Sequence, residues 1–153
     1  MSSFLKQLED LYGKNNTCVR ENLCGKLIDS GSTRVVYECK LHNGYVVKEE
    51  ISQPCINNIS EHIIWDCFKY APWYAKWFSE VVFISSSGKY LVMKKLFVNT
   101  DNKFPKRVPY FFTDLKKKNF GYDGKLFKCC DYAFVIQKMS GLMTPKLINV
   151  KWR

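Results

Sequence analysis

Residues 34–51 read Arg-Val-Val-Tyr-Glu-Cys-Lys-Leu-His-Asn-Gly-Tyr-Val-Val-Lys-Glu-Glu-Ile and contain the clearest strand signals of the sequence. Two runs rich in β-branched and aromatic residues flank the turn signal His42-Asn43-Gly44, a pattern typical of a β-hairpin. A third run of this kind, Leu23 to Asp29, comes directly before the hairpin. The spacing therefore predicts a meander of three antiparallel strands.

The sequence on either side of the meander predicts two helices. Residues 3–12 carry one apolar stripe, with Ser2 or Ser3 as its N-cap. A second helix is expected after Pro54, with Asn58 or Ser60 as its cap. Its expected apolar stripe recurs at steps of three and four residues and consists of Ile59, Ile63, Cys67, Phe68 and Ala71.

Two further apolar runs, 81–85 and 90–94, predict a second pair of strands joined by a turn that contains Gly88. At 153 residues the chain is expected to form one domain. The order of elements, with three strands, a helix and two more strands after the first helix, predicts an α+β fold.

The composition is ordinary for a folded protein, but the charge is not. Lys and Arg number 24 against 14 Asp and Glu, which gives a net charge of +10. Such a field attracts nucleotide phosphates, nucleic acid or an acidic protein surface. No apolar run approaches the roughly 20 residues of a membrane span, and the chain starts without a signal-peptide pattern. We expect a cytoplasmic protein that does not bind membranes.

The cysteines do not indicate a disulfide framework or a zinc site. Their number, seven, is odd, no Cys-x-x-Cys pair occurs, and the chain has only two histidines. Structural zinc sites use four Cys or His ligands at short, paired spacings. Most of these cysteines are therefore expected to be small buried apolar residues.

Five short segments carry charged or polar residues at positions that suit phosphate chemistry. The turn 27–38 contains Gly31, and Lys48 ends the strand signal Val-Val-Lys. Glu61 follows Lys48 by thirteen residues and shares a face of the predicted helix with Ile64 and Phe68. Further along, residues 113–121 read Thr-Asp-Leu-Lys-Lys-Lys-Asn-Phe-Gly, and Asp131-Tyr-Ala follows a predicted hairpin.

In order and spacing these segments resemble the motifs of the protein kinase superfamily. In the glycine-rich loop G-x-G-x-x-G-x-V, only Gly31 and Val36 hold their places. The Val-Val-Lys triplet is similar to the strand-three lysine motif. Residues 114–119 are similar to the catalytic loop, in which the aspartate precedes the asparagine by five residues. Asp131-Tyr-Ala stands where the family has D-F-G.

The resemblance implies roles for individual residues, with ATP and Mg²⁺ as cofactors. The implied catalytic residues are Asp114, Lys116, Lys48 and Glu61. Those implied to contact the nucleotide are Gly31, Ser32 and Val36, together with Lys48. Asn119 and Asp131 would hold the metal, because magnesium prefers oxygen ligands shared with substrate phosphates.

The departures from the family pattern concern the second lobe. Phe112-Thr113 replaces the family's His-Arg, and the 17 residues from 97 to 113 contain two prolines, so a long helix cannot fit there. Only 22 residues follow Asp131. The resemblance implies a kinase-like N-lobe, in which a five-stranded antiparallel sheet packs on one main helix, followed by a vestigial C-lobe. We expect an N-terminal helix (1–14), an N-lobe-like part (23–96) and a reduced catalytic-loop and metal-binding segment (97–153).

The resemblance leaves two functions open. One is a minimal protein kinase that phosphorylates a Ser, Thr or Tyr hydroxyl of a protein; compact kinase-like proteins of this type occur in phages and act in the host cytoplasm. The other is a pseudokinase that binds an acidic partner through its basic surface. Nucleic-acid binding is a third alternative, based on interleaved basic and aromatic residues from Lys103 to Arg153. A homodimer is compatible with both the kinase and the pseudokinase hypotheses.

Overall fold

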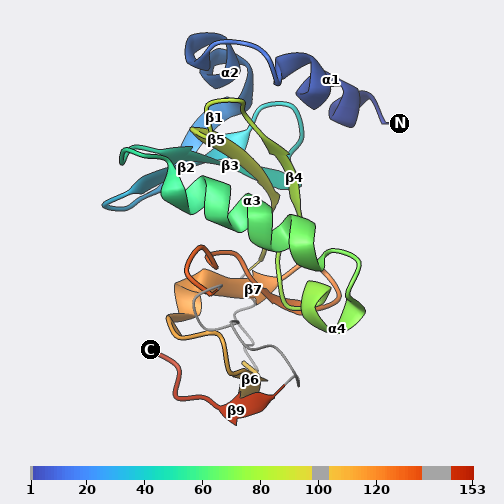
Figure 1. The fold of residues 1–153 in the computed structure, drawn as a ribbon, viewed down its shortest axis with the longest axis vertical. Coiled ribbons are helices and arrows are strands. Elements are labelled where there is room, and N and C mark those ends of the chain that lie inside the picture. The colour runs from blue at the N-terminus through green and yellow to red at the C-terminus, as the bar shows by residue number, and fades with distance from the viewer. Residues whose placement is uncertain (1, 98–103, 136–145) are drawn as a thin grey trace.

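The protein has a mixed α+β fold built on a five-stranded antiparallel sheet (Figure 1). The computed structural model describes residues 2–97, 104–135 and 146–153. The strands lie in the order β1-β2-β3-β5-β4, so the predicted meander and both later strands are confirmed. Their bounds are β1 (Cys24–Ser30), β2 (Arg34–Cys39), β3 (Tyr45–Glu50), β4 (Val81–Ile84) and β5 (Tyr90–Lys94).

Strand β3 lies at the centre of the sheet and has a different environment on each face. Val36 on β2 and Leu91 on β5 are the register partners of Lys48 on either side. Because side chains alternate along a strand, Val46 and Lys48 lie on one face of β3, and Val47 lies on the other. The alternation assigns Lys48 to the face that helix α3 covers.

Helices α1 (Ser3–Leu11) and α2 (Asn16–Leu23) cover the Val47 face of the sheet. The predicted N-cap of α1 is confirmed, since the Ser2 side chain accepts a hydrogen bond from the backbone N–H of Leu5. Helix α2 was not predicted. It begins at the Asn15 cap, directly after the turn that ends α1, and its Val19 and Leu23 are buried against the sheet.

Helix α3 (Ile56–Phe68) crosses the other face of the sheet, and α4 (Pro72–Ala75) follows it (Figure 1). The predicted stripe of α3 is wrong, because Ile59, Ile63 and Cys67 are exposed. The side facing the sheet buries Asn58, Glu61 and Ile64 instead. Polar groups are tolerated there because each of them is hydrogen-bonded or ion-paired.

The predicted cap of α3 is also wrong. The N-cap position is Cys55, whose side chain makes no capping bond, and Asn58 lies inside the helix. Instead, the carboxylate of Glu50 at the end of β3 accepts two hydrogen bonds from the start of α3. One comes from the backbone N–H of Asn58 and the other from the side chain of Asn57. A carboxylate at a helix N-terminus satisfies free N–H groups and complements the helix dipole.

A smaller part of the fold lies beyond one end of the sheet (Figure 1). It contains the hairpin β7 (Phe120–Tyr122) and β8 (Phe127–Cys129), the pair β6 (Arg107–Pro109) and β9 (Leu147–Asn149), and the 3₁₀ turn η1 (Lys117–Asn119). Its core is aromatic and includes Phe78, Phe111, Phe112, Phe120 and Tyr132. Residues 104–135 and 146–153 contain no α-helix. The expectation drawn from the two prolines concerned residues 97–113, of which residues 98–103 lie outside the described ranges.

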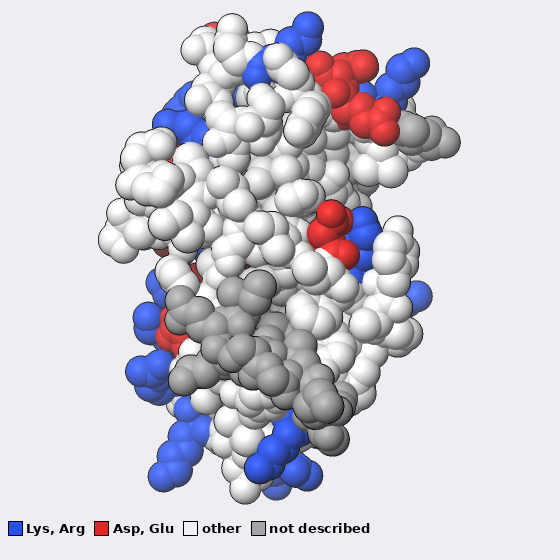
Figure 2. Space-filling model, viewed as in Figure 1, with Lys and Arg blue, Asp and Glu red and all other residues white. Residues whose placement is uncertain are grey.

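No helix in the described part of the chain is both long and apolar enough to cross a membrane. On the face shown in Figure 2, the centre is largely uncharged, and Lys and Arg side chains gather at the end where β6 and β9 lie.

Candidate functional site

A cavity of about 260 Å³ opens between the sheet and the smaller part of the fold. From the sheet it is lined by Gly31, Val36 and Lys48, and from the opposite side by Asn119 and Asp131. The structure thus brings together five of the residues singled out in the sequence, although more than 80 residues separate the first two strands from Asp131. We refer to this cavity as the cleft.

A buried ion pair forms the back of the cleft. Lys48 on β3 and Glu61 on α3 are 5% and 0% exposed, and Lys48 Nζ lies 2.9 Å from Glu61 Oε2. The structure therefore brings these two residues, both singled out in the sequence, into direct contact. This contact arises because the strand alternation and the inward face of α3 aim both side chains at the same point.

The same pair holds the backbone around Asp131. The ammonium of Lys48 donates a hydrogen bond to the carbonyl oxygen of Cys130. On the other side of Asp131, the backbone N–H of Tyr132 donates to Glu61 Oε1 at 3.0 Å, and the Tyr132 hydroxyl donates to the carbonyl of Ser79. Both peptides that flank Asp131 are thus fixed, and its side chain is directed at the cleft.

Arg34 is the main component of the site that the sequence analysis did not identify. Its guanidinium forms a two-pronged contact with Glu61, with Nη1–Oε2 at 2.7 Å and Nη2–Oε1 at 3.1 Å, and Nη2 also lies 2.6 Å from Asp131 Oδ1. In the sequence, Arg34 is only a substitution at a glycine position. A usable signal was present, because Arg34 is two residues from Val36 on β2 and so shares its face of the sheet.

The buried cluster is ionised. Burial alone would raise the pKa of Glu61, but the charges of Arg34 and Lys48 outweigh burial and hold that pKa below its ordinary value. For Arg34, burial works against the charged form, and Glu61 and Asp131 more than compensate, so its pKa is raised. Two cations and two carboxylates therefore meet at the back of the cleft.

Asp114 lies beside the cleft and has three charged or polar neighbours. The Asn119 amide nitrogen donates to its Oδ2 at 3.0 Å, and Lys116 Nζ lies 3.4 Å from the same oxygen. Arg153 Nη2 lies 3.3 Å from Oδ1. The contact with Arg153 had no sequence signal, because it depends on the path of a segment that follows Asp114 by 39 residues.

The turn that contains Gly31, within residues 27–38, has few glycines. Its geometry does not support all of the nucleotide contacts implied for Gly31, Ser32 and Val36. The N–H of Gly31 donates to the carbonyl of Arg34 at 2.8 Å, so it already has a partner inside the turn. Ser32 is exposed and is not among the residues that line the cleft. Val36 does line it, as an apolar wall. With few glycines, the turn cannot approach a ligand as closely as a glycine-rich loop does.

The oxygen atoms in the cleft fit a magnesium ion only if bound phosphates share it. No group of three or more His, Cys, Asp or Glu side chains in the described ranges could hold a metal alone. Asn119 and Asp131 both line the cleft, and the Asn119 amide nitrogen faces Asp114, which leaves its oxygen for a ligand. Magnesium is commonly bound by one or two such oxygens together with substrate phosphates.

Two cysteine thiols lie near this oxygen pair and are poor nucleophiles. Burial raises the pKa of Cys129 well above its ordinary value and raises that of Cys130, which lines the cleft, to about 11. Since the thiolate is the reactive form, neither side chain suits covalent catalysis at neutral pH. The chemistry of the cleft is therefore that of its cations, carboxylates and amide.

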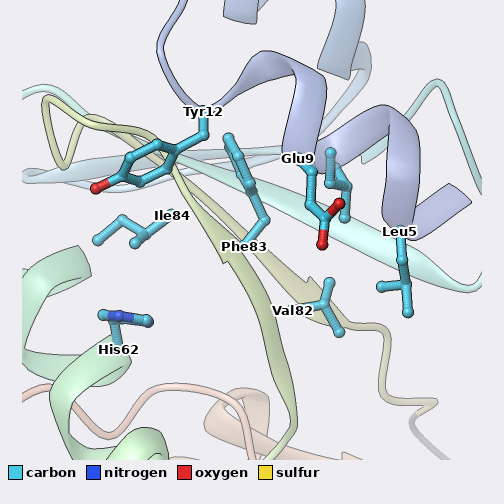
Figure 3. A pocket seen from close by; sticks show the side chains of 8 residues that line it. Leu5, Glu9, Tyr12, His62, Val82, Phe83 and Ile84 are labelled. Carbon is cyan, nitrogen blue, oxygen red and sulfur yellow. The ribbon is translucent and has the colours of Figure 1, made fainter. Parts of the chain in front are cut away.

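A larger cavity of about 520 Å³ lies elsewhere, between α1, α3 and β4 (Figure 3). Its walls are mainly apolar, with Glu9, Tyr12 and His62 as the polar side chains, and no Lys or Arg of the described residues lines it. None of the residues singled out in the sequence lines it. Size alone therefore does not identify the functional site, and the cleft remains the candidate.

Comparison of the chain with protein-family models, with curated proteins and with solved structures found no match. The interpretation of the cleft consequently rests on its own geometry and on the sequence motifs that meet there.

Proposed function

We propose that the chain is a minimal kinase-like phosphotransferase, whose cleft binds ATP with Mg²⁺ and which transfers a phosphoryl group to a hydroxyl of a protein. The observation that carries this proposal is the buried Lys48–Glu61 pair at 2.9 Å, facing Asn119 and Asp131 across the cleft. Fixed cations opposite oxygen ligands are the arrangement that phosphoryl transfer requires.

The sheet side of the cleft suits a nucleotide. Val36, Val46 and Leu96 provide apolar contacts for a base, and Lys48 provides the cation for the phosphates. Lys48 is held beside a carboxylate that is itself completely buried, which keeps its ammonium close to the phosphate position before a ligand binds. The five-stranded sheet with one helix on this face supports assignment to a kinase-like N-lobe, with the remaining residues as a reduced second lobe.

The opposite side suits the transfer step. Asp114 is half-exposed and is positioned to accept a hydrogen bond from an acceptor hydroxyl, and Lys116 beside it would contact the transferred phosphoryl group. Asn119 and Asp131 would hold Mg²⁺ once phosphates are bound. The ion supplies charge neutralisation and orientation of the phosphates.

The proposal is tested by binding and transfer measurements on matched variants. Wild-type protein should be stabilised by ATP with Mg²⁺ in a thermal-shift titration, and it should transfer labelled phosphate to itself or to casein as a probe substrate. Lys48→Ala should lose both activities. Asp114→Asn should keep binding and lose transfer. Lys26→Ala, an exposed lysine on β1, is the control and should change neither.

Absence of any ATP-dependent shift at millimolar ATP with Mg²⁺ would exclude nucleotide binding in the cleft. Transfer that persists at the wild-type rate in Asp114→Asn would exclude the assigned role of Asp114. Either result separates the binding half of the proposal from its catalytic half.

A second candidate is a kinase-like binding protein without transferase activity. The contact of Arg34 with Asp131 favours it, because this acidic group already has a cationic partner where a metal ion would bind. In this case nucleotide binding occurs without transfer, and the excess positive charge serves an acidic protein partner or a second copy of the chain. An origin in a phage and action on host cytoplasmic proteins belong to either candidate.

A further inference from the structure

The cleft is unusually cationic for a site that depends on a metal ion. Its lining includes Arg34 and four lysines, namely Lys48, Lys94, Lys95 and Lys118. The acidic side chains in the same lining are Asp29 and Asp131. Cationic side chains thus outnumber acidic ones before any ion is added, and the cleft attracts anions by itself.

Arg34 neutralises Asp131, one of the two carboxylates that line the cleft. Its Nη2 lies 2.6 Å from Asp131 Oδ1, and the Arg34 side chain is only 10% exposed. Without that contact, Asp131 would repel the phosphates unless a divalent ion stood between them. In this protein a fixed guanidinium already supplies the positive charge at that position.

The shared contact with Glu61 also leaves Lys48 available to a ligand. Arg34 binds both oxygens of Glu61, so that buried carboxylate keeps a cationic partner when the Lys48 ammonium turns toward a phosphate. With Lys48 as the only partner, the same motion would leave a buried charge unpaired, which is costly. Two cations on one buried carboxylate thus permit one of them to bind an anion.

We propose that Arg34 takes the place of a divalent ion in nucleotide binding, so that the cleft binds metal-free nucleoside triphosphates. This inference rests on the proposed nucleotide site and adds a specific property to it. Mg²⁺ remains a requirement for phosphoryl transfer and not for binding. Arg34 acts here as a positioning residue for Asp131 and as a fixed charge beside the phosphates.

The experiment is a calorimetric titration of the whole protein with ATP, performed once with Mg²⁺ and once with EDTA. The wild-type dissociation constant in EDTA should lie within about tenfold of that in Mg²⁺. Arg34→Gln should weaken binding in EDTA by at least about tenfold more than binding in Mg²⁺. Arg107→Gln, an arginine on β6 outside the cleft, is the matched control and should alter neither constant.

Because Arg34→Gln leaves Glu61 with one partner fewer and can impair folding, Asp131→Asn provides a second readout. Removing this negative charge should leave the affinity for ATP in EDTA unchanged or higher. It should also abolish any increase in that affinity on addition of Mg²⁺. Circular dichroism and thermal unfolding establish that each variant is folded before titration.

The outcomes separate this inference from the proposed function. Wild-type binding with Mg²⁺ but not with EDTA overturns the role of Arg34 and leaves the nucleotide site intact. Equal losses for Arg34→Gln under both conditions also overturn it. Binding under neither condition overturns the nucleotide site and this inference together.

Discussion

The carboxylate of Asp114 lies 3.3 Å from the guanidinium of Arg153, a residue from the far end of the described chain. The contact is fixed by backbone pairing, since the N–H of Arg153 donates to the carbonyl of Leu115 and its own carbonyl accepts from the N–H of Lys117. The segment that carries Asp114 is thus held by a neighbouring extended segment. No α-helix of the described residues takes part in this support.

Replacement of Arg153 should affect the transfer step more than nucleotide binding. Arg153→Ala removes one cation from Asp114 but leaves Lys48, Asn119 and Asp131 untouched. Because exposed ion pairs contribute about 0.2–1 kcal/mol, we expect a two- to fivefold lower kcat with an unchanged KM for ATP. Steady-state kinetics with casein as acceptor provide both constants.

Lys151→Ala is the matched control, since Lys151 is an exposed cation two residues away with no ion pair among the described residues. It should leave kcat unchanged. An equal fall in kcat for both variants would show that general positive charge, and not the contact with Asp114, is responsible.

Glu50 should be important for stability although it is acidic and completely buried. Its two oxygens accept hydrogen bonds from the Ser52 hydroxyl, the Asn57 side chain and the backbone N–H of Asn58. Glu50→Gln puts an NH₂ group where a donor already points, so at least one bond is lost. We expect about 1–3 kcal/mol lower free energy of unfolding, the usual cost of an unsatisfied buried polar group.

Urea denaturation measures this difference. Glu38→Gln on β2 makes the same chemical change at an exposed site and should shift the free energy of unfolding by less than about 0.5 kcal/mol. Equal stabilities of the two variants would mean that the Glu50 network does not hold the start of α3.

Local sequence patterns predicted the sheet well, because each strand has its own alternation and its own turn signal. The hairpin around His42-Asn43-Gly44 and the position of Lys48 on β3 follow from these short-range rules. Glu61 was also placed correctly, since the thirteen-residue spacing and its helix face are both visible in the chain. The α+β class was predictable for the same reason, whereas the union of all five strands in one antiparallel sheet was implied by the family resemblance.

Features that depend on long-range packing were missed or wrong. The apolar stripe of α3 was assigned to the buried side, whereas burial of Asn58 and Glu61 is possible only with partners from β2 and β3. Arg34 appeared as a defect in a loop motif because its two carboxylate partners lie 27 and 97 residues away. The spacing of apolar residues indicates which side of a helix is apolar. It does not indicate which charged residues of a distant segment will pair with polar residues on that helix.

The turn between β7 and β8 should make the protein sensitive to acid through Asp123. Burial would raise the pKa of this carboxyl, but hydrogen bonds from the backbone N–H groups of Leu126 and Lys125 and the ammonium of Lys128 lower it to about 2. Because this pKa is below the ordinary value of 3.8, the carboxylate stabilises the fold above pH 4. That contribution is lost as the pH falls from about 4 to about 2.

Asp123→Asn should isolate this contribution. The amide oxygen can still accept the two N–H groups, but the pair with Lys128 at 3.1 Å is gone. We expect about 1–2 kcal/mol lower free energy of unfolding at pH 7, and a difference from wild type that shrinks toward zero near pH 2. Urea denaturation between pH 2 and pH 7 measures it, with Asp10→Asn on α1 as the exposed control. A difference that stays constant across this range would show that the charge of Asp123 is not what stabilises the turn, because only an ionisable group produces a loss that follows the pH.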